Sequence, residues 1–316
     1  MRLLHFVLTV GCSACAEPTV PAAEPAPSAS HSMVYHDGLS AVLLVNTGLG
    51  GMSTPPSSTK TVLWRWTGSD WLVQDANGPP IRNLAGVAYD AKRNVLVMYG
   101  GSYDETKVYD ETWEWRVNGG WSMVAVTGPG KRDHTQMVYD AARERVVLVG
   151  GQVGTGVFPS PTWTFDGVSW QQFAAGGPGG RIHHGLVYDA VGQRVLAFGG
   201  ITSSGDAGDT WAWTGTAWSA AAPSITPRSH ASLARTSRGI VLMGGFPANS
   251  PLLLLENSAW RTDAQANAPT GRYLAAYAYD SKRNVTVLFG GGNAATDDLY
   301  ADTWEFSEST GWRKIR

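Results

Sequence analysis

Cysteine is almost missing from this chain of 316 residues, because its two copies, Cys12 and Cys15, both lie within the first 16. The rest of the chain therefore has no thiol and can form no disulfide. A chain of this length buries enough apolar surface to fold without covalent cross-links. The scarcity of cysteine also argues against a disulfide scaffold.

Charge is also scarce, with 16% charged residues and a net charge of -2. A nucleic-acid-binding domain usually carries a basic surface, so the composition gives that function no electrostatic support. Long apolar runs are missing as well. Beyond Ala16 the run of leucines at 252–255 is only four residues long, far short of a membrane span.

Paired glycines recur along the chain at nearly even intervals of 50, 50, 49, 45 and 46 residues. The pairs begin at Gly50, Gly100, Gly150, Gly199, Gly244 and Gly290. Such a period is longer than that of the common helical solenoids and is typical of propeller blades. The spacing predicts six structural units.

The units repeat the same landmarks with some departures, such as Ser28 in place of the arginine in unit one, and Arg235-Thr236 and Leu253 in place of Tyr-Asp and the third-run tryptophan in unit five. An arginine precedes a first apolar run that ends in Tyr-Asp, a second run ends in Gly-Gly, and tryptophans mark the third and fourth runs. In the third unit these landmarks are Arg132, Tyr139-Asp140, Gly150-Gly151, Trp163 and Trp170. Four short apolar runs separated by turn residues predict one four-stranded blade.

The chain thus resembles the kelch-repeat family over residues 28–316. The resemblance implies an all-β fold, a six-bladed β-propeller of four-stranded antiparallel blades. Ring closure by packing of the first blade on the sixth, with no swapped strand, is expected. The family includes both binding modules and enzymes, so the fold alone does not settle the function.

All 14 tryptophans fall on the third or fourth run of a unit. In a Trp-x-Trp pair both rings project from one face of a strand, because side chains alternate with period two. We expect these rings to pack between blades. Stacking on sugar rings is the alternative use.

Residues 1–16 resemble an export signal, with Arg2 before an apolar stretch. Two interpretations remain open. Thr9-Val10-Gly11-Cys12 resembles a bacterial lipobox with Cys12 as the lipidated residue, whereas Ala14-Cys15-Ala16 fits a cleavage site that releases a soluble protein. A wrongly assigned start in a cytosolic protein is a third reading. Residues 17–27, rich in Pro and Ala, predict an extended tether.

Antiparallel strands place the arginines, the Gly-Gly pairs and the connections between second and third strands on one face. These connections are long and differ between units, which marks this long-loop face as the candidate binding surface. The opposite face carries short turns. The kelch resemblance implies ligand binding on the same long-loop face.

The recurring arginines are expected to be structural and to pair with an acid two places before the third-run tryptophan. That acid is Glu111, Asp209 or Asp302 in units two, four and six. Pro161 and Pro251 replace it in units three and five. Arg132 and Arg228 therefore lack a partner within their own unit, and we predict that they are the arginines most free to meet a ligand.

Histidines follow the arginine by two places in three consecutive units, as His134, His183 and His230, with His184 beside them. A metal site would need three or four ligands at one point. Equivalent positions on a ring are kept apart unless they point at its axis. Buried, hydrogen-bonded histidines are therefore favoured over a metal site.

Aromatic and acidic residues in the long loops complete the candidate ligand site. They are Tyr103, Asp104, Phe158, Phe246, Asp297 and Tyr300. Exposed aromatic rings beside carboxylates suit a sugar or a peptide. Solvated acidic loops without a ligand are the simpler explanation.

The predicted function is a non-catalytic, exported binding propeller of the cell envelope or the secreted fraction, with a protein or glycan ligand. It needs no cofactor, binds no nucleic acid, and meets a membrane only through a lipid on Cys12. A sugar-modifying enzyme, like the mutarotase known among kelch relatives, is the alternative. Another relative, galactose oxidase, uses a copper site with a tyrosine–cysteine cross-link, which cannot form in a propeller without cysteine.

Overall fold

The computed structural model describes residues 24–29, 31–46, 59–103, 107–124, 126–173, 176–247, 250–269, 271–293, 295–296 and 298–316. The predicted export signal, most of the tether, Cys12, Asp104 and Asp297 lie outside these ranges. Within them the only helix is η1 (Asp37–Leu39), a single 3-10 turn. The same ranges contain no helix with the length and apolarity to cross a membrane.

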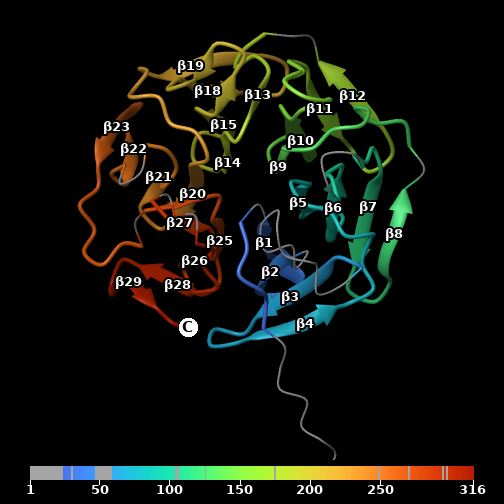
Figure 1. The fold of residues 1–316 in the computed structure, drawn as a ribbon, viewed down its shortest axis with the longest axis horizontal. Helices are drawn as coiled ribbons and strands as arrows, with labels where there is room; N and C mark the ends of the chain where they lie inside the picture. The colour runs from blue at the N-terminus through green and yellow to red at the C-terminus, as the bar shows by residue number, and fades with distance from the viewer. Residues whose placement is uncertain are drawn as a thin grey trace, which may run out of the picture.

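Six four-stranded antiparallel sheets surround a common axis, one for each predicted unit, in the part of the chain that the structure describes (Figure 1). The prediction of an all-β propeller is confirmed. We number the sheets as blades in chain order. In each blade the first strand lies nearest the axis and the fourth lies at the rim (Figure 1).

The first three blades follow this order without interruption. Blade one contains β1 (Ser32–His36), β2 (Ala41–Asn46), β3 (Val62–Trp66) and β4 (Trp71–Asp75). Blade two contains β5 (Gly86–Asp90), β6 (Val95–Tyr99), β7 (Thr112–Arg116) and β8 (Gly120–Val124). Blade three contains β9 (Gln136–Asp140), β10 (Arg145–Val149), β11 (Thr162–Phe165) and β12 (Trp170–Phe173).

Of the last three blades, the fourth and the sixth have additional short strands outside the blade sheet. Blade four contains β14 (Gly185–Asp189), β15 (Arg194–Phe198), β18 (Thr210–Trp213) and β19 (Trp218–Ala222), with β13 (Arg181–Ile182), β16 (Ile201–Thr202) and β17 (Gly205–Asp206) outside the blade. Blade five contains β20 (Ser232–Thr236), β21 (Gly239–Met243), β22 (Leu253–Glu256) and β23 (Ala259–Thr262). Blade six contains β25 (Ala276–Asp280), β26 (Val285–Phe289), β28 (Thr303–Ser307) and β29 (Gly311–Lys314), with β24 (Arg272–Tyr273) and β27 (Gly292–Asn293) outside it.

Burial explains the order of the strands within a blade. All five residues of β6 are buried, because the second strand is covered by neighbouring blades on both faces. In β4 only Trp71 is fully buried, and Leu72 and Val73 are exposed. An apolar run without alternation thus forms an inner strand, and a run with one tryptophan forms the rim.

In blades two to six the paired glycines end the second strand in a conformation that favours glycine. Gly100 and Gly101 have φ angles of 66° and 89°, and later pairs repeat these values closely. The amide of Gly101 donates to the carbonyl of Arg132 in the next blade at 2.9 Å. The Gly-Gly pair therefore joins neighbouring blades as well as turning the chain.

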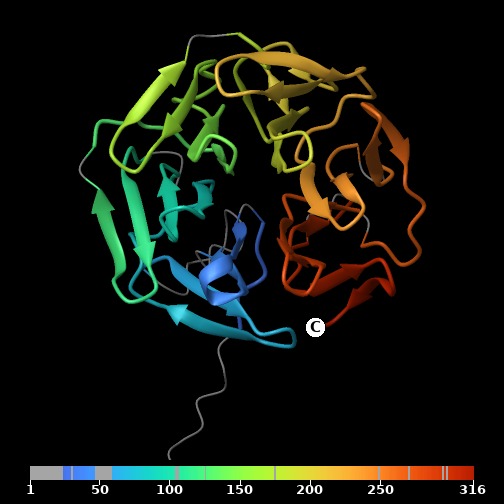
Figure 2. The same ribbon diagram turned by 180° about the vertical axis from the view of Figure 1, so that it is seen from behind.

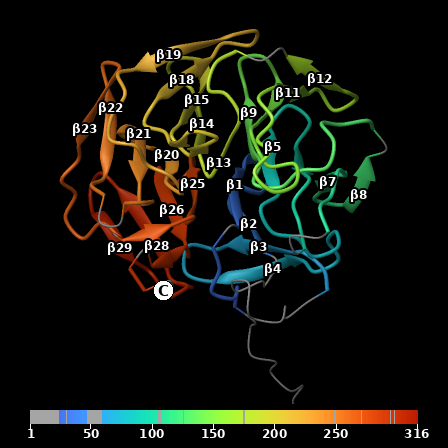
Figure 3. The ribbon, with the colours of Figure 1, turned by 45° about the horizontal axis from the view of Figure 1, so that its top comes forward.

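Ring closure needs no exchanged strand, because each four-stranded sheet is built from one continuous stretch of chain. Blade one and blade six share a core that contains Met33, Trp71, Ala276 and Phe289. Figures 1 and 3 show β28 and β29 beside β3 and β4 at this junction. The sequence-based expectation for the closure is met.

Candidate functional site

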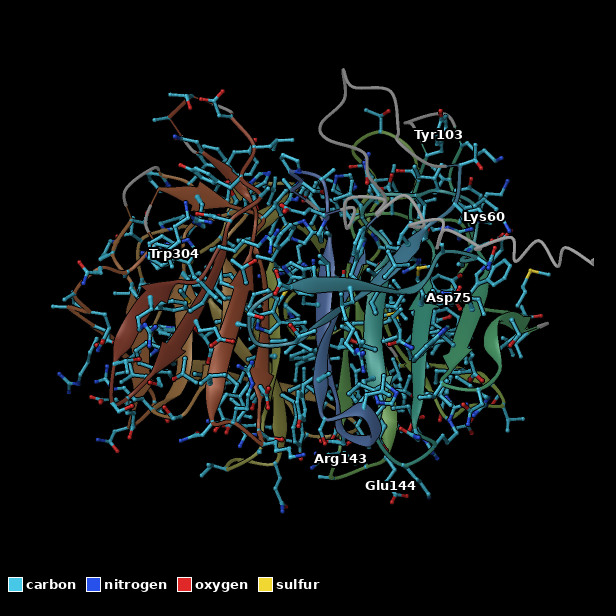
Figure 4. All side chains as sticks on the ribbon, turned by 90° about the horizontal axis from the view of Figure 1, so that it is seen from below. Lys60, Asp75, Tyr103, Arg143, Glu144 and Trp304 are labelled. Atoms are coloured by element: carbon cyan, nitrogen blue, oxygen red, sulfur yellow. The ribbon has the colours of Figure 1, made fainter. Side chains whose placement is uncertain are left out.

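The two faces of the ring carry different structures. In a side view Tyr103 lies at one edge of the propeller, and Arg143 and Glu144 lie at the opposite edge (Figure 4). Tyr103 belongs to the connection after β6, whereas Arg143 and Glu144 form the tight turn between β9 and β10. The long-loop face and the turn face of the prediction are therefore separate surfaces.

Short antiparallel ladders reinforce the long-loop face. The segment before a first strand pairs with the segment after Gly-Gly, as in β24 with β27 and β13 with β16. Single bridges do the same at Asp133–Gln152 and Ser229–Phe246. Residues around the channel mouth are thus held by backbone hydrogen bonds.

Three of the recurring arginines are structural, as predicted. Arg82 pairs with Glu111 at 2.8 Å, Arg181 with Asp209 at 2.8 Å, and Arg272 with Asp302 at 2.9 Å. Each of these acids also accepts a hydrogen bond from the indole of the nearby tryptophan, namely Trp113, Trp211 or Trp304. These carboxylates are occupied within the scaffold.

Arg132 and Arg228 have no acid partner among the described residues, as the prolines predicted. Arg228 donates to the carbonyl of Pro251 at 2.9 Å, and Arg132 donates to the carbonyls of Pro129 and Gly150. Both are nevertheless only 4% exposed, because their guanidinium groups fold back onto the backbone. Burial lowers the pKa of Arg228 to about 10. They are unpaired cations beneath the surface, and they are less accessible than the sequence suggested.

The second residue after each arginine adopts a left-handed conformation, with φ between 50° and 58° in blades two to six. Leucine holds this position in blades two and six, and histidine holds it in the three blades between. The residues are Leu84, His134, His183, His230 and Leu274. Four of them, all except His230, line a cavity of about 140 Å³ on the propeller axis.

The three histidines meet at this position, although their blades were expected to separate them unless they pointed at the axis. The ring centroids of His183 and His230 are 3.8 Å apart and stacked, and those of His134 and His183 are 4.6 Å apart. Phe246 lies 5.3 Å from His230 and 5.2 Å from Tyr273. We call these five residues, His134, His183, His230, Phe246 and Tyr273, the mouth cluster.

The imidazoles of His183 and His230 are held in the uncharged form at neutral pH. Burial lowers the pKa of His230 to about 4. Burial and then the neighbouring imidazoles of His230 and His134 lower the pKa of His183 well below its usual value. A neutral imidazole offers one donor and one acceptor, so His183 and His230 form a polar but uncharged part of this aromatic surface.

His134 is oriented by a carboxylate. Its Nδ1 lies 2.7 Å from Oδ1 of Asp133, which is 6% exposed. Burial alone would raise the pKa of Asp133, but the hydrogen bonds from His134 and Ser102 outweigh it and hold the pKa below its usual value. A histidine fixed by a buried carboxylate can accept a proton through its other nitrogen.

His184 differs from its neighbour in the sequence. It is 2% exposed, lines the axial cavity, and neither of its ring nitrogens has a partner in the described residues. Burial lowers its pKa to about 3. It is buried as predicted, but it is not hydrogen-bonded there.

The remaining predicted residues do not gather into one site. Tyr300 stacks over the structural Arg272 at 4.4 Å, and Tyr103 is 41% exposed. Phe158 is half-buried, and its backbone lies so close to Gly180 that a Cβ there would collide with it. Of the predicted loop residues, only Phe246 contacts the predicted histidines.

Tyr273 and Asp133 were missed by the sequence analysis. Both directly follow the recurring arginine, where the residue changes from blade to blade as Asn83, Asp133, Ile182, Ser229 and Tyr273. This position varies from blade to blade, although the arginine before it and the left-handed residue after it follow a regular pattern. That variation was the signal in the sequence that could have identified Tyr273 and Asp133. Among the described residues, no set of three His, Cys, Asp or Glu side chains is placed to hold a metal ion.

No protein-family model and no curated protein matches the chain. The solved structure of the protein YjhT is similar over 92% of this chain and 98% of its own, with a TM-score of 0.71 and 13% sequence identity. Identity this low shows the fold alone. Together with the four-stranded antiparallel sheets, this similarity identifies the fold as a propeller that fits the kelch type.

Proposed function

We propose that the protein is a binding propeller whose protein or glycan ligand docks on the mouth cluster of the long-loop face. The observation that carries the proposal is the chain of ring contacts at the axis, in which His134 contacts His183, His183 stacks on His230, and His230 contacts Phe246 and Tyr273. Two of the equivalent positions are leucines, so a propeller of this type does not need histidine there. A departure from the repeat at a partly exposed surface is a candidate for function.

The chemistry of the cluster suits a neutral or weakly polar ligand surface. Aromatic faces bind the apolar face of a sugar ring or a peptide side chain, and neutral imidazoles hydrogen-bond to hydroxyl and amide groups. Arg132 and Arg228 lie in blades three and five, on either side of His183 in blade four. Their unpaired charges favour a ligand that also carries an acidic group.

A glycan array and a peptide array, each probed with the purified protein, test the proposal. The variant pair His183→Leu and His230→Leu copies the leucines of blades two and six, so the fold should tolerate it. We expect binding to weaken at least tenfold, or about 1.4 kcal/mol. Met123→Ser, on the exposed rim strand β8, is the matched control. Equal binding by the double variant and the native protein would place the ligand elsewhere.

A sugar-modifying enzyme is the second candidate, and the Asp133–His134 pair supports it. Ring opening of a sugar requires a group that removes a proton and returns it, and an oriented histidine suits that role. Three acids of the long-loop face, Glu111, Asp209 and Asp302, are less suited to this role, because they are already bound to arginine and tryptophan. Polarimetry on freshly dissolved free sugars tests for turnover. If the native protein turns over a sugar and both His134→Leu and Asp133→Asn lose that activity, the enzyme proposal replaces the binding-only proposal.

We propose that the protein is exported, on the basis of residues 1–16 alone. Mass spectrometry of the mature protein separates the two processing routes. Loss of residues 1–11 with a lipid on Cys12 supports the lipoprotein, and an unmodified start after Ala16 supports the soluble form. The Cys12→Ala variant should lose the lipid in the first case only.

A further inference from the structure

A second cavity lies at the opposite end of the axis, on the turn face, where η1 stands in front in Figure 2. Its volume is about 320 Å³, which reaches the lower end of the range for small-molecule sites, about 300 to 1,000 Å³. Residues from the first strands of all six blades line it. The mouth cluster does not contribute to it.

The fourth residue of each first strand surrounds this cavity. Five of the six are tyrosines and one is an arginine: Tyr35, Tyr89, Tyr139, Tyr188, Arg235 and Tyr279. The second residue of each strand lies deeper, and five of these six are apolar: Met33, Val87, Met137, Leu186 and Leu233. The cavity therefore has a ring of tyrosines at its entrance and an apolar inner wall.

Two of the tyrosines are fixed by hydrogen bonds within their own blades. The hydroxyl of Tyr279 donates to the side chain of Asn284. The hydroxyl of Tyr89 donates to Asn94 at 2.8 Å. Rings held in this way are ordered before any ligand arrives, which lowers the entropic cost of binding.

Arg235 breaks the ring of tyrosines. It is exposed, and its guanidinium lies 4.7 Å from the centre of the Tyr279 ring. In four other blades an aspartate follows the tyrosine and pairs with a nearby arginine, as Asp90 does with Arg93. Thr236 takes the place of that aspartate in blade five. No carboxylate among the described residues pairs with Arg235.

From this geometry we propose that the turn-face cavity binds a small carboxylate with an apolar aryl or alkyl group. The apolar group fills the cavity between the tyrosine rings and the inner wall, and the carboxylate pairs with Arg235. The guanidinium is suited to this role, because its planar donors match the two carboxylate oxygens. The proposal does not depend on the function assigned to the mouth cluster.

A cationic ligand is the main competitor, because aromatic rings attract cations. Asp37 is the acidic residue that lines the cavity, and Arg235 is the basic one. However, Arg235 already lies against one ring of the cavity and would repel a second cation. An anionic ligand is attracted by the charge of Arg235 and still makes the apolar contacts in the cavity.

Calorimetric titration with three matched probes tests the proposal. The probes are 3-phenylpropionate, its neutral counterpart 3-phenylpropanol and its cationic counterpart 3-phenylpropylamine. We expect 3-phenylpropionate to bind most tightly to the native protein. The variant Arg235→Tyr restores the repeat, so it should fold, and it should weaken carboxylate binding at least tenfold while leaving 3-phenylpropanol unchanged.

Two further variants control the result. Arg235→Lys keeps the charge and should retain part of the carboxylate binding. If Arg235→Tyr does not fold, Arg235→Lys serves as the test variant in its place. His230→Leu, at the opposite end of the axis, should leave 3-phenylpropionate binding unchanged. Equal affinity for the three probes, preference for the amine, or no binding at millimolar concentration would each overturn the proposal.

Discussion

The indole nitrogen of Trp170 in blade three donates a hydrogen bond to the hydroxyl of Thr112 in blade two at 2.9 Å. Trp170 is the first residue of a rim strand, and Thr112 is the first residue of a third strand. The same bond joins three more pairs of neighbouring blades: Trp71 with Thr303, Trp218 with Thr162, and Trp260 with Thr210. The tryptophans therefore fix the blades through directed bonds as well as through apolar packing.

Thr112→Val should destabilise the fold by about 1 to 3 kcal/mol, because it leaves the indole of Trp170 buried without an acceptor. Valine keeps the shape of threonine, so little packing is lost. Urea unfolding followed by tryptophan fluorescence measures the effect. Trp121 is the natural control: Leu63 stands where its threonine would be, and its indole nitrogen is already unpartnered. Equal stability of the variant would show that the bond contributes nothing.

Pro161→Asp should stabilise the protein by about 1 to 3 kcal/mol, because an acid here can pair with Arg132. It can also accept from the indole of Trp163, which is buried without a partner. Blades two, four and six show both bonds. Pro161→Ala removes the proline without adding the acid and is the matched control. If Arg132 contributes to ligand binding, the Pro161→Asp variant should be more stable in urea and should bind more weakly on the glycan or peptide array.

Acid should destabilise the protein through its buried histidines. Burial lowers the pKa of His31 and of His230 to about 4, whereas unfolded histidine titrates near 6.5. Between these values the unfolded chain binds more protons, so the free energy of unfolding should fall as the pH drops from about 6.5 to about 4. Urea unfolding at a series of pH values measures the slope. His230→Leu should make the slope shallower, and an unchanged slope would exclude this histidine as a source.

Tyr277→Phe should leave the stability unchanged or raise it by up to about 1 kcal/mol. The hydroxyl of Tyr277 is buried and has no hydrogen-bond partner in the described residues, so removing it removes a desolvation cost. Thermal unfolding of the variant checks this. Tyr89→Phe, which removes a buried hydroxyl bonded to Asn94 at 2.8 Å, should instead lower the stability. A clear loss in Tyr277→Phe would mean that its hydroxyl has a partner such as a buried water.

The repeat made most of the scaffold predictable. Gly-Gly, the paired arginines and the tryptophans recur because every blade needs the same turns and the same inter-blade contacts. The contrast between Asp209 and Pro161 even predicted which arginines lack an acid partner. Local spacing was sufficient for these features, because each depends on residues within one or two blades.

The two ends of the axis were not predictable in the same way. The contact of His183 with His230 depends on a left-handed backbone that turns both rings toward one point, and the spacing of the residues does not reveal that conformation. The tyrosines of the Tyr-Asp turns were assigned to the scaffold, which is correct for the hydroxyl bonds of Tyr89 and Tyr279. These tyrosines also line a cavity together with Arg235, and this arrangement exists only when the six blades close into a ring.

Ser28 has a role at the ring junction that its side chain does not suggest. The amide of Gly291 in blade six donates to its carbonyl at 2.9 Å, as the amide of Gly101 donates to the carbonyl of Arg132. The junction between the last and first blades is therefore bonded like the others. Because this junction repeats the backbone bond of the others, a circularly permuted chain that starts at blade three, with the original ends joined by a short linker, should fold to the same ring and keep both axial cavities.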